Sequence, residues 1–250
     1  MNTNLFKYCL RLGDNSLILG HRLAEYCSYG PYLEEDISIT NTSLDLIGQA
    51  EAILKYAALV ENAERTADDL AYRRPEIEFY NVQLVEQPNG NFAHLIARQF
   101  FIDAFNFYLY SALKESTDNT IASIAAKSLK EVTYHLRRSS EWVIRLGDGT
   151  SESKIKMQEA INDFWLYTFE MFEMDEVDEE LITKAITVDL KPIQDLWNKK
   201  VDEILVMATL TRPEDGYMAT GSRKGYHSEH LGYILAEMQY LPRAYPTAKW

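Results

Sequence analysis

One stretch of sequence decides the fold class, and it reads Ile121-Ala-Ser-Ile-Ala-Ala-Lys-Ser-Leu-Lys-Glu-Val-Thr-Tyr-His-Leu-Arg-Arg-Ser-Ser-Glu-Trp-Val143. Its apolar residues recur every three or four positions, which predicts a long amphipathic helix. Helical bundles that hold two metal ions carry Glu-x-x-His on two such helices and a single Glu on each of two others. Here Val132 stands at the Glu position before His135. The nearest carboxylate, Glu131, comes one residue early, and this turns it about 100° around the helix axis. The stretch has the pattern of a metal-binding bundle but lacks a ligand.

The composition indicates a single all-α domain over residues 1–250. A chain of 250 residues is long enough to bury a large core, helix formers dominate, and no stretch alternates as a half-buried strand does. The chain contains 16 Tyr, 10 Phe and 4 Trp. These aromatic residues either fill a large core or fill a core and also supply a partner interface. The sequence leaves both interpretations open.

The formal net charge of −13 argues against nucleic acid and anionic membranes as partners. No apolar run reaches the ~18 residues that span a bilayer, and the first residues contain no signal-peptide core. The two cysteines, Cys9 and Cys27, form neither a disulfide framework nor a metal-binding motif, which is typical of a reducing compartment. We therefore expect a cytoplasmic protein whose acidic surface suits a basic partner.

Turn and capping residues divide the chain into about seven helices. We expect them at about residues 16–27, 36–62, 92–115, 119–147, 151–173, 190–210 and 228–241. Asn91 is an expected N-cap, Asp118 or Asn119 opens the fourth helix, and Pro242 is expected to end the last one. The stretch 170–180 carries seven carboxylates and no base, which predicts a solvated connector.

Polar residues on apolar helix faces are the candidate site residues. Asp103 lies among core positions of its helix, so it should be buried and then paired, neutralised or bound to a metal. Two interpretations are open, namely a single carboxylate ligand, or a structural Asp satisfied by His135, an Arg or a Tyr hydroxyl. Asp45 is a second carboxylate, but Gly48 stands where its helix would need an imidazole. With Gly48 and Val132, both Glu-x-x-His pairs are incomplete.

Asp45, Asp103 and His135 remain as a polar cluster. Three such groups could bind zinc, although a charge-paired network without metal is the favoured interpretation. Gly48 inside a helix costs ~1 kcal/mol relative to Ala. This cost suggests a packing reason, such as the close approach of another helix.

The segment Gly225-Tyr-His-Ser-Glu-His-Leu-Gly232 brackets a helix start with two histidines. Ser228 is the expected N-cap. His227 and His230 are either metal ligands or part of a packing or docking segment, and the second interpretation is favoured because no cysteine is near. No nucleophile elbow, Walker loop or Gly-x-Gly-x-x-Gly motif occurs in the chain. The sequence therefore offers no catalytic residue of these classes.

Several longer motifs carry a resemblance to a known family. They read LRLGDN (10–15), LDLIGQA (44–50), LVEQPNGNFA (84–93), IARQ (96–99), YHLR (134–137), HSEHLG (227–232) and LAEMQYL (235–241). On these motifs the chain resembles the C-type (structural) subunits of bacterial phenylacetyl-CoA epoxidase, also called ring-1,2-phenylacetyl-CoA monooxygenase. The likeness extends over essentially the whole chain.

The resemblance implies a ferritin-like helical bundle with additional C-terminal helices and a role in aerobic phenylacetate breakdown. It implies a complex that inserts one oxygen atom into the aromatic ring of phenylacetyl-CoA. The implied partners are an A-type catalytic subunit that holds the di-iron centre and the substrate, a small B-type subunit, and a reductase that takes electrons from NADPH through flavin and iron–sulfur groups. The C-type subunits have degenerate ligands, so the resemblance brings no catalytic residue, metal or cofactor to this chain.

The main hypothesis from the sequence is a non-catalytic subunit of a hetero-oligomer that docks against and stabilises the A-type subunit. One rival is a metal-dependent oxygenase that acts by itself through a di-metal site rebuilt from Asp45, Asp103, His135 and Glu131. Another rival is a purely structural, homo-oligomeric helical protein without an enzyme partner.

Overall fold

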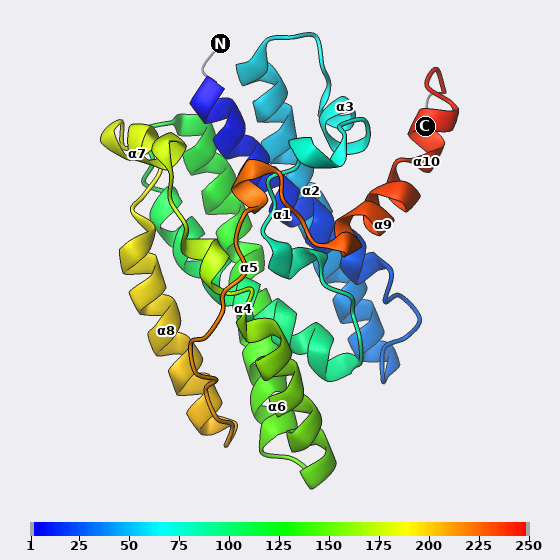
Figure 1. Ribbon diagram of the computed structural model, residues 1–250, viewed down its shortest axis with the longest axis vertical. Coiled ribbons are helices and arrows are strands. Elements are labelled where there is room, and N and C mark those ends of the chain that lie inside the picture. Colours follow the sequence, from blue (N-terminus) through cyan, green and yellow to red (C-terminus); the bar gives the residue numbers. More distant parts are fainter. Residues whose placement is uncertain (1–2, 249–250) are drawn as a thin grey trace. The chain divides into compact units, whose positions relative to one another are not determined.

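The chain is helical along most of its length. A computed structural model describes residues 3–248, and within this range it contains ten α-helices, four short 3-10 helices and no β-strand (Figure 1). The all-α prediction is confirmed. The chain divides into two compact units, one formed by residues 1–88 and 221–250 and the other by residues 89–220. The single domain over 1–250 stays a prediction. No helix among the described residues has the length and apolar character needed to cross a membrane.

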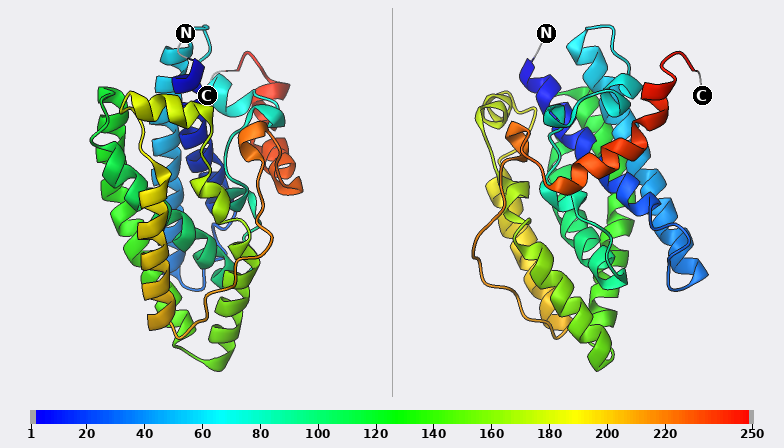
Figure 2. Two further views of the ribbon diagram at one scale, coloured as in Figure 1. Left: turned by 60° about the vertical axis from the view of Figure 1, so that its left-hand side comes forward. Right: turned by 45° about the vertical axis from the view of Figure 1, so that its right-hand side comes forward.

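The first unit is a long helical hairpin to which the C-terminal segment returns. Its elements are α1 (Thr3–Ala24), α2 (Leu33–Glu61), α3 (Ala67–Tyr72), η1 (Glu76–Glu78), η2 (Gln83–Glu86), η4 (Ser222–Lys224), α9 (Glu229–Met238) and α10 (Tyr240–Ala244). Helices α1 and α2 run side by side (Figure 2), and α9 packs against α1, η1 and η2. The unit is therefore assembled from two stretches that are far apart in the sequence.

Helix α1 begins at Thr3 rather than near Ser16 as predicted. Gly13 lowers the local preference for helix, but the glycine has a packing role here. A Cβ on Gly13 would lie only 2.8 Å from Cδ2 of Leu54 on α2. The close contact with α2 thus overrides the local signal.

The start of α2 agrees with the sequence to within a turn. The helix begins at Leu33, and Asp36 lies in its first turn, as predicted. The Asp36 carboxylate also accepts hydrogen bonds from the backbone N–H groups of Ser28 (2.7 Å) and Gly30 (3.1 Å). The loop between α1 and α2 is thereby fixed to the helix that follows it.

The second unit is built around the helix pair α4 and α5. Its elements are α4 (Phe92–Leu113), α5 (Asn119–Gly147), α6 (Ser151–Trp165), η3 (Phe169–Phe172), α7 (Glu176–Thr183) and α8 (Leu190–Met207). Asn91 caps α4 and Asp118 caps α5, each by accepting hydrogen bonds from two backbone N–H groups of the first turn. Both N-cap predictions are confirmed. Helices α6 and α8 pack against α4.

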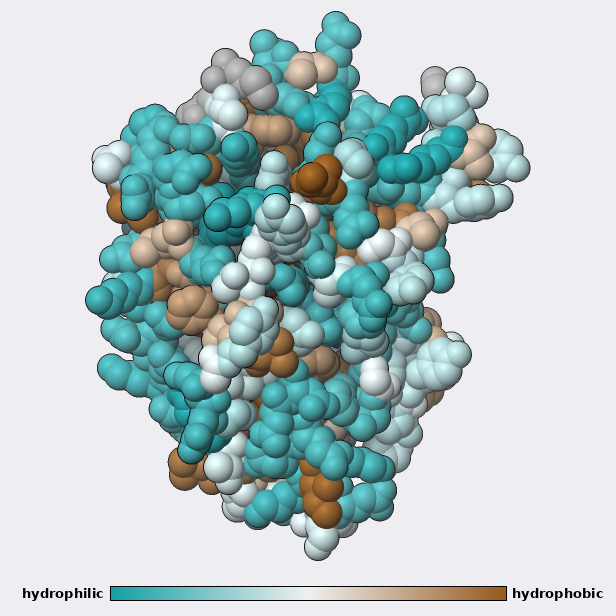
Figure 3. Space-filling view, in the orientation of Figure 1, coloured by the Kyte–Doolittle hydropathy of each residue, from teal (hydrophilic) through white to brown (hydrophobic). Residues whose placement is uncertain are grey.

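Aromatic residues fill the core of the second unit. The ring centroid of Trp197 lies 5.8 Å from that of Trp165, 5.7 Å from that of Phe101 and 5.4 Å from that of Phe172. The indole N–H of Trp197 donates to the carbonyl oxygen of Phe101 at 2.9 Å. Exposed tyrosines also occur, at positions 29, 32, 134, 217, 226, 233, 240 and 245. The face shown in Figure 3 is mainly hydrophilic, with scattered apolar side chains. The large aromatic core is therefore confirmed. A partner interface that uses the exposed tyrosines stays a prediction.

The acidic stretch 170–180 is not a solvated connector. Glu170 is fully buried, Asp178 is nearly so, and α7 starts within the stretch behind a capping box formed by Asp175. The prediction was wrong because it considered only the charges of the stretch and not the burial of Glu170 and Asp178.

The prediction that Pro242 ends the last helix is also wrong, since Pro242 lies inside α10. Proline is tolerated there because the first turn of a helix has N–H groups without intrahelical partners.

Gly48 has no close neighbour in the chain. A Cβ at this position would meet no atom within 4 Å. The expected close approach of another helix of the same chain is therefore wrong. Gly147, at the end of α5, is the opposite case, because a Cβ there would clash with the backbone carbonyl oxygen of Ala208.

The two glycines should respond oppositely to alanine. We expect Gly48→Ala to raise the free energy of unfolding by about 0.5–1 kcal/mol, because alanine lowers the entropy cost of the helix and meets no clash. Gly147→Ala should lower it, since backbone must move to admit the methyl group. Urea denaturation of both variants checks this, and a destabilised Gly48→Ala would show that the position is more crowded than the structure indicates.

Candidate functional site

Asp103 on α4 is the buried carboxylate of the second unit, as the sequence predicts. Its side chain is about 1% exposed. Its Oδ2 atom accepts a hydrogen bond from the hydroxyl of Ser139 on α5 at 2.8 Å, and Oδ1 accepts one from Nε2 of Gln99 at 2.6 Å. The hydrogen bonds thus come from a hydroxyl and an amide, while His135 and Arg138 act on Asp103 through their charges, in line with the His and Arg partners that the sequence suggested.

The environment of Asp103 changes its protonation. Burial raises the pKa of the Asp103 carboxyl from its usual 3.8 to about 6. The charge of His135, the hydrogen bonds from Ser139 and Gln99, and the charge of Arg138 all lower that pKa, but they do not offset the burial. The carboxyl group therefore changes its charge in mildly acidic solution.

The neighbouring positions on α5 supply few metal donors. His135 is buried, Val132 is fully buried, and Glu131 is half-buried. Ser139 was missed from the sequence, although it stands four residues after His135 and so faces the same way on the helix. Within residues 3–248, His, Cys, Asp and Glu side chains form no group of three or more that could hold a metal ion.

Asp45 and Gly48 belong to the first unit. Both lie on α2, and Asp45 is half-buried. The grouping of Asp45 with Asp103 and His135 in one polar cluster stays a prediction. The donor set does not fit a di-iron centre of the Glu-x-x-His kind, because Val132 and Gly48 have no donor atom.

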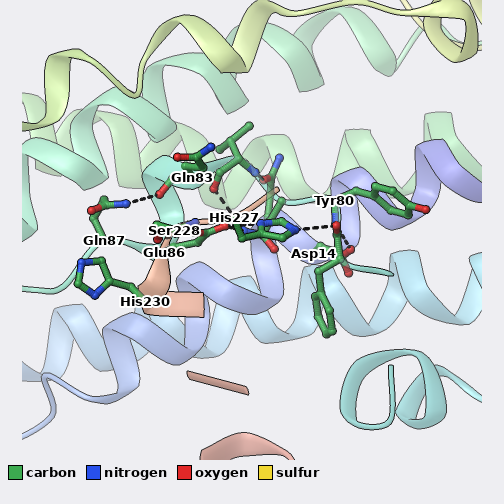
Figure 4. A network of polar contacts seen from close by, with 12 residues as sticks. Asp14, Tyr80, Gln83, Glu86, Gln87, His227, Ser228 and His230 are labelled. Carbon is green, nitrogen blue, oxygen red and sulfur yellow. Dashed lines mark hydrogen bonds and ion pairs between the residues drawn. The ribbon is translucent and has the colours of Figure 1, made fainter. Parts of the chain in front are cut away.

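A second buried carboxylate, Glu86, organises the first unit. Its Oε1 atom accepts a hydrogen bond from Nδ2 of Asn81 at 2.8 Å and lies 2.6 Å from Nδ1 of His227. Its Oε2 atom accepts from the backbone N–H of Ser228 at 2.8 Å and from the Ser228 hydroxyl at 2.6 Å. Figure 4 shows His227 and Ser228 pointing toward Glu86. The carboxylate therefore joins residues 81–86 to residues 227–228.

The bonds of His227 define its protonation. The ring nitrogen Nε2 lies 2.9 Å from the carbonyl oxygen of Phe79, which can only accept, so Nε2 carries a proton. An ionised Glu86 also only accepts, so Nδ1 then carries a second proton. The side chains of His227 and Glu86 are both fully buried, and they form an ion pair when the imidazole is protonated at both nitrogens.

These contacts define the roles of His227 and Ser228 within the segment 225–232. Both ring nitrogens of His227 already have partners, which leaves none for a metal ion. Ser228 occupies the N-cap position of α9, but its hydroxyl bonds Glu86 instead of the helix N–H groups. His227 and Ser228 thus have the predicted packing role, while the role of His230 stays a prediction.

A further ion pair holds the irregular stretch that precedes Glu86. Asp14 on α1 pairs with Arg74, whose NH1 lies 3.1 Å from Oδ2, and Oδ2 also accepts from the backbone N–H of Tyr80 at 3.0 Å. The guanidinium of Arg74 lies over the ring of Phe79, 4.1 Å from its centroid. Beside Asp14, the side chain of Asn15 accepts from the backbone N–H of Val82 at 2.8 Å. The motif at residues 10–15 therefore anchors residues 74–82.

The comparisons with known proteins agree with these motifs. A family model described as "Phenylacetic acid catabolic protein" matches residues 1–250. The chain belongs to this family. The phenylacetic acid catabolic proteins have a ferritin-like helical fold, so the predicted fold and the resemblance are both confirmed.

One curated relative is similar over nearly its full length. The chain is 49% identical over 246 residues to a protein of Escherichia coli (strain K12) that is named as the C subunit of 1,2-phenylacetyl-CoA epoxidase. The match covers 98% of this chain and 99% of the relative. The relative is, by its name, one component of an epoxidase with several different chains.

The pKa of Asp103 predicts a pH dependence of stability. The folded state holds this proton up to about pH 6, whereas the unfolded state releases it near 3.8. The stabilisation is therefore fully present below pH 3.8 and is lost as the pH rises through 6, a loss of about 3 kcal/mol. Asp103→Asn removes this titration. We expect the stability of the variant relative to the native chain to rise by about this amount from pH 4 to pH 7 in urea denaturation.

The exposed Glu159 provides the control for this measurement. Glu159→Gln should show no comparable change with pH, because its side chain faces solvent. A stability difference between Asp103→Asn and the native chain that stays constant from pH 4 to pH 7 would contradict the assignment.

Removal of the Glu86 carboxylate should destabilise the first unit. Glu86→Ala leaves the charge of His227 buried without a partner, so we expect a loss of about 3–5 kcal/mol. Glu229→Ala, which removes an exposed carboxylate nearby, should change stability by less than about 0.5 kcal/mol. Limited proteolysis of the Glu86→Ala variant should cut first within residues 221–248. Equal protection of this segment in both variants would show that Glu86 does not hold it.

Proposed function

We propose that this chain is the C-type subunit of a phenylacetyl-CoA epoxidase of phenylacetate catabolism. In this role it is a non-catalytic structural subunit that docks against and stabilises a di-iron catalytic subunit of the A type. The observation that carries the proposal is the 49% identity over 98% of the chain to a protein whose name makes it the C-type component of such an epoxidase.

The geometry supports a structural rather than a catalytic role. Asp103 has both oxygens engaged by Ser139 and Gln99, and the place of a ligand on α5 is taken by the apolar Val132. The di-iron centre that activates oxygen belongs, in this proposal, to the A-type subunit. What this chain contributes is a rigid helical body in which buried carboxylates are satisfied by hydrogen bonds and ion pairs.

The proposal includes the rest of the assembly and its place. The chain forms a hetero-oligomer with the A-type subunit and the small B-type subunit. A reductase with flavin and iron–sulfur groups delivers electrons from NADPH. The complex acts in the cytoplasm, in keeping with a buried thiol at Cys9 and an exposed thiol at Cys27.

Purification with and without the A-type subunit tests the proposal. We expect the chain alone to contain less than ~0.1 iron by elemental analysis, because its bundle lacks the Glu-x-x-His pairs. The A-type subunit should co-purify with the chain and unfold at higher temperature in the pair. At a chain concentration of 100 times the dissociation constant this stabilisation is about 2.7 kcal/mol.

The outcomes distinguish the rivals. About two irons in the purified chain would favour the oxygenase that acts by itself. A chain that self-associates and does not bind the A-type subunit would favour a homo-oligomeric structural protein. An A-type subunit that is equally stable and active alone would leave the stabilising role without support.

A further inference from the structure

Helix α2 carries apolar side chains on two opposite faces. One face is buried, mainly against α1, and contains Ile39, Leu46, Ala50, Ile53, Leu54 and Ala57. The other face exposes Leu33 by 71%, Ile37 by 50%, Leu44 by 64% and Leu59 by 77%. A surface helix of a globular protein has one apolar face. The second apolar face of α2 is therefore unexplained by the packing of this chain.

The exposed residues form one stripe. With about 100° of rotation per residue, Leu33, Ile37, Leu44 and Leu59 fall within ~80° of one another around the helix axis. Gly48 lies in the same sector, and so do Glu51 and Lys55, whose exposed ion pair stands between Gly48 and Leu59. We name Leu33, Ile37, Leu44, Gly48 and Leu59 the α2 outer stripe. It extends from Leu33 to Leu59, about 39 Å at 1.5 Å per residue, which is long enough for a whole partner helix.

Gly48 makes a gap in the middle of the stripe. Among residues 3–248, apart from the two chain neighbours and the nearby backbone of α2 itself, no atom lies within 4 Å of a Cβ built at this position. Glycine in the middle of a helix costs about 0.5–1 kcal/mol relative to alanine, and no described residue occupies the space. A large side chain from a partner helix can enter this gap and bring the two helices close together.

The charges around the stripe indicate what kind of partner fits. Helix α2 contains six carboxylate residues and one base. Glu61 is buried and pairs with Arg65, Lys55 is ion-paired with Glu51 at 2.5 Å, and Glu34, Glu35, Asp36 and Asp45 lie in the N-terminal half of the helix. A second copy of the chain would face this acidic helix with the same charges, and like charges across an interface are unfavourable. A helix flanked by basic side chains complements it.

We propose that the α2 outer stripe is the docking surface for an amphipathic, basic-flanked helix of the A-type catalytic subunit. A large apolar side chain of that helix occupies the gap over Gly48, and Leu33, Ile37, Leu44 and Leu59 pack on either side of it. The identity of the partner rests on the proposed function, while the position of the surface rests on the exposed stripe, the gap and the charges of α2.

Two variants test the surface in purified components. Leu44→Glu places a charge in the centre of the stripe, and Gly48→Leu fills the gap from this side. Binding to immobilised A-type subunit should weaken about thirtyfold or more in each, which is the loss expected for a hot-spot residue. Ile155→Glu is the matched control, because Ile155 is a similarly exposed apolar residue on α6, and its binding should equal that of the native chain.

The gap variant has a signature that a structural role does not produce. Leucine is a better helix former than glycine, and a Cβ at position 48 meets no atom within 4 Å, so the isolated Gly48→Leu chain should unfold at the same or a higher temperature. If the Gly48→Leu chain is as stable as the native chain but binds the A-type subunit more weakly, the loss of binding comes from the exposed face of α2 and not from misfolding.

Each result decides between the proposals. If the native chain binds the A-type subunit and both variants bind equally well, the surface lies elsewhere and the proposed function stands. If the native chain does not bind, both proposals fail. If the isolated chain sediments as a dimer that Leu44→Glu dissociates, the stripe belongs to a second copy and the proposed occupant is wrong. Weakening of the same size by Ile155→Glu also overturns the assignment to α2.

Discussion

The burial of the Glu86 carboxylate is the constraint on which the first unit depends. A carboxylate removed from water is costly unless donors and a compensating charge surround it. The donors come from Asn81 on one side of the sequence and from His227 and Ser228 on the other. Since neither stretch satisfies Glu86 alone, the C-terminal segment has to return to α1 before the unit is complete. The same contact explains why α9 lies where it does.

Asp103 is a buried carboxyl group in the second unit, and its surroundings compensate less for the loss of water than those of Glu86 do. Its direct partners, Ser139 and Gln99, are neutral, and the charge of His135 does not outweigh the burial, so the carboxyl group keeps a raised pKa. In a di-metal bundle, a cation would stabilise the charge of a carboxylate at such a place. Here hydrogen bonds from the Ser139 hydroxyl and the Gln99 amide hold the side chain in place.

The sequence predicted those features that depend on local patterns. The caps at Asn91 and Asp118 and the burial of Asp103 follow from residues within one or two helical turns, and they are confirmed. The bond between Glu86 and His227 joins positions 141 residues apart, and no local pattern indicates it. The early start of α1 was missed for a similar reason. Gly13 lowers the local preference for helix, and only its contact with Leu54 shows why the helix continues. Partners of buried groups are a property of the tertiary fold, whereas caps and periodicity are not.

Gly48 links the chemistry that the bundle lacks to the surface that it presents. In a metal-binding helix of the Glu-x-x-His type this position would carry an imidazole. As glycine it contributes no donor, and it opens a gap on the exposed side of α2. Four large apolar side chains lie along the same sector, and each would gain about 1.5–3 kcal/mol if an initially exposed side chain became fully buried. A helix that exposes this much apolar surface is less costly in a complex than in water. Because Gly48 faces the exposed side of α2, its missing side chain bears on the docking surface proposed above.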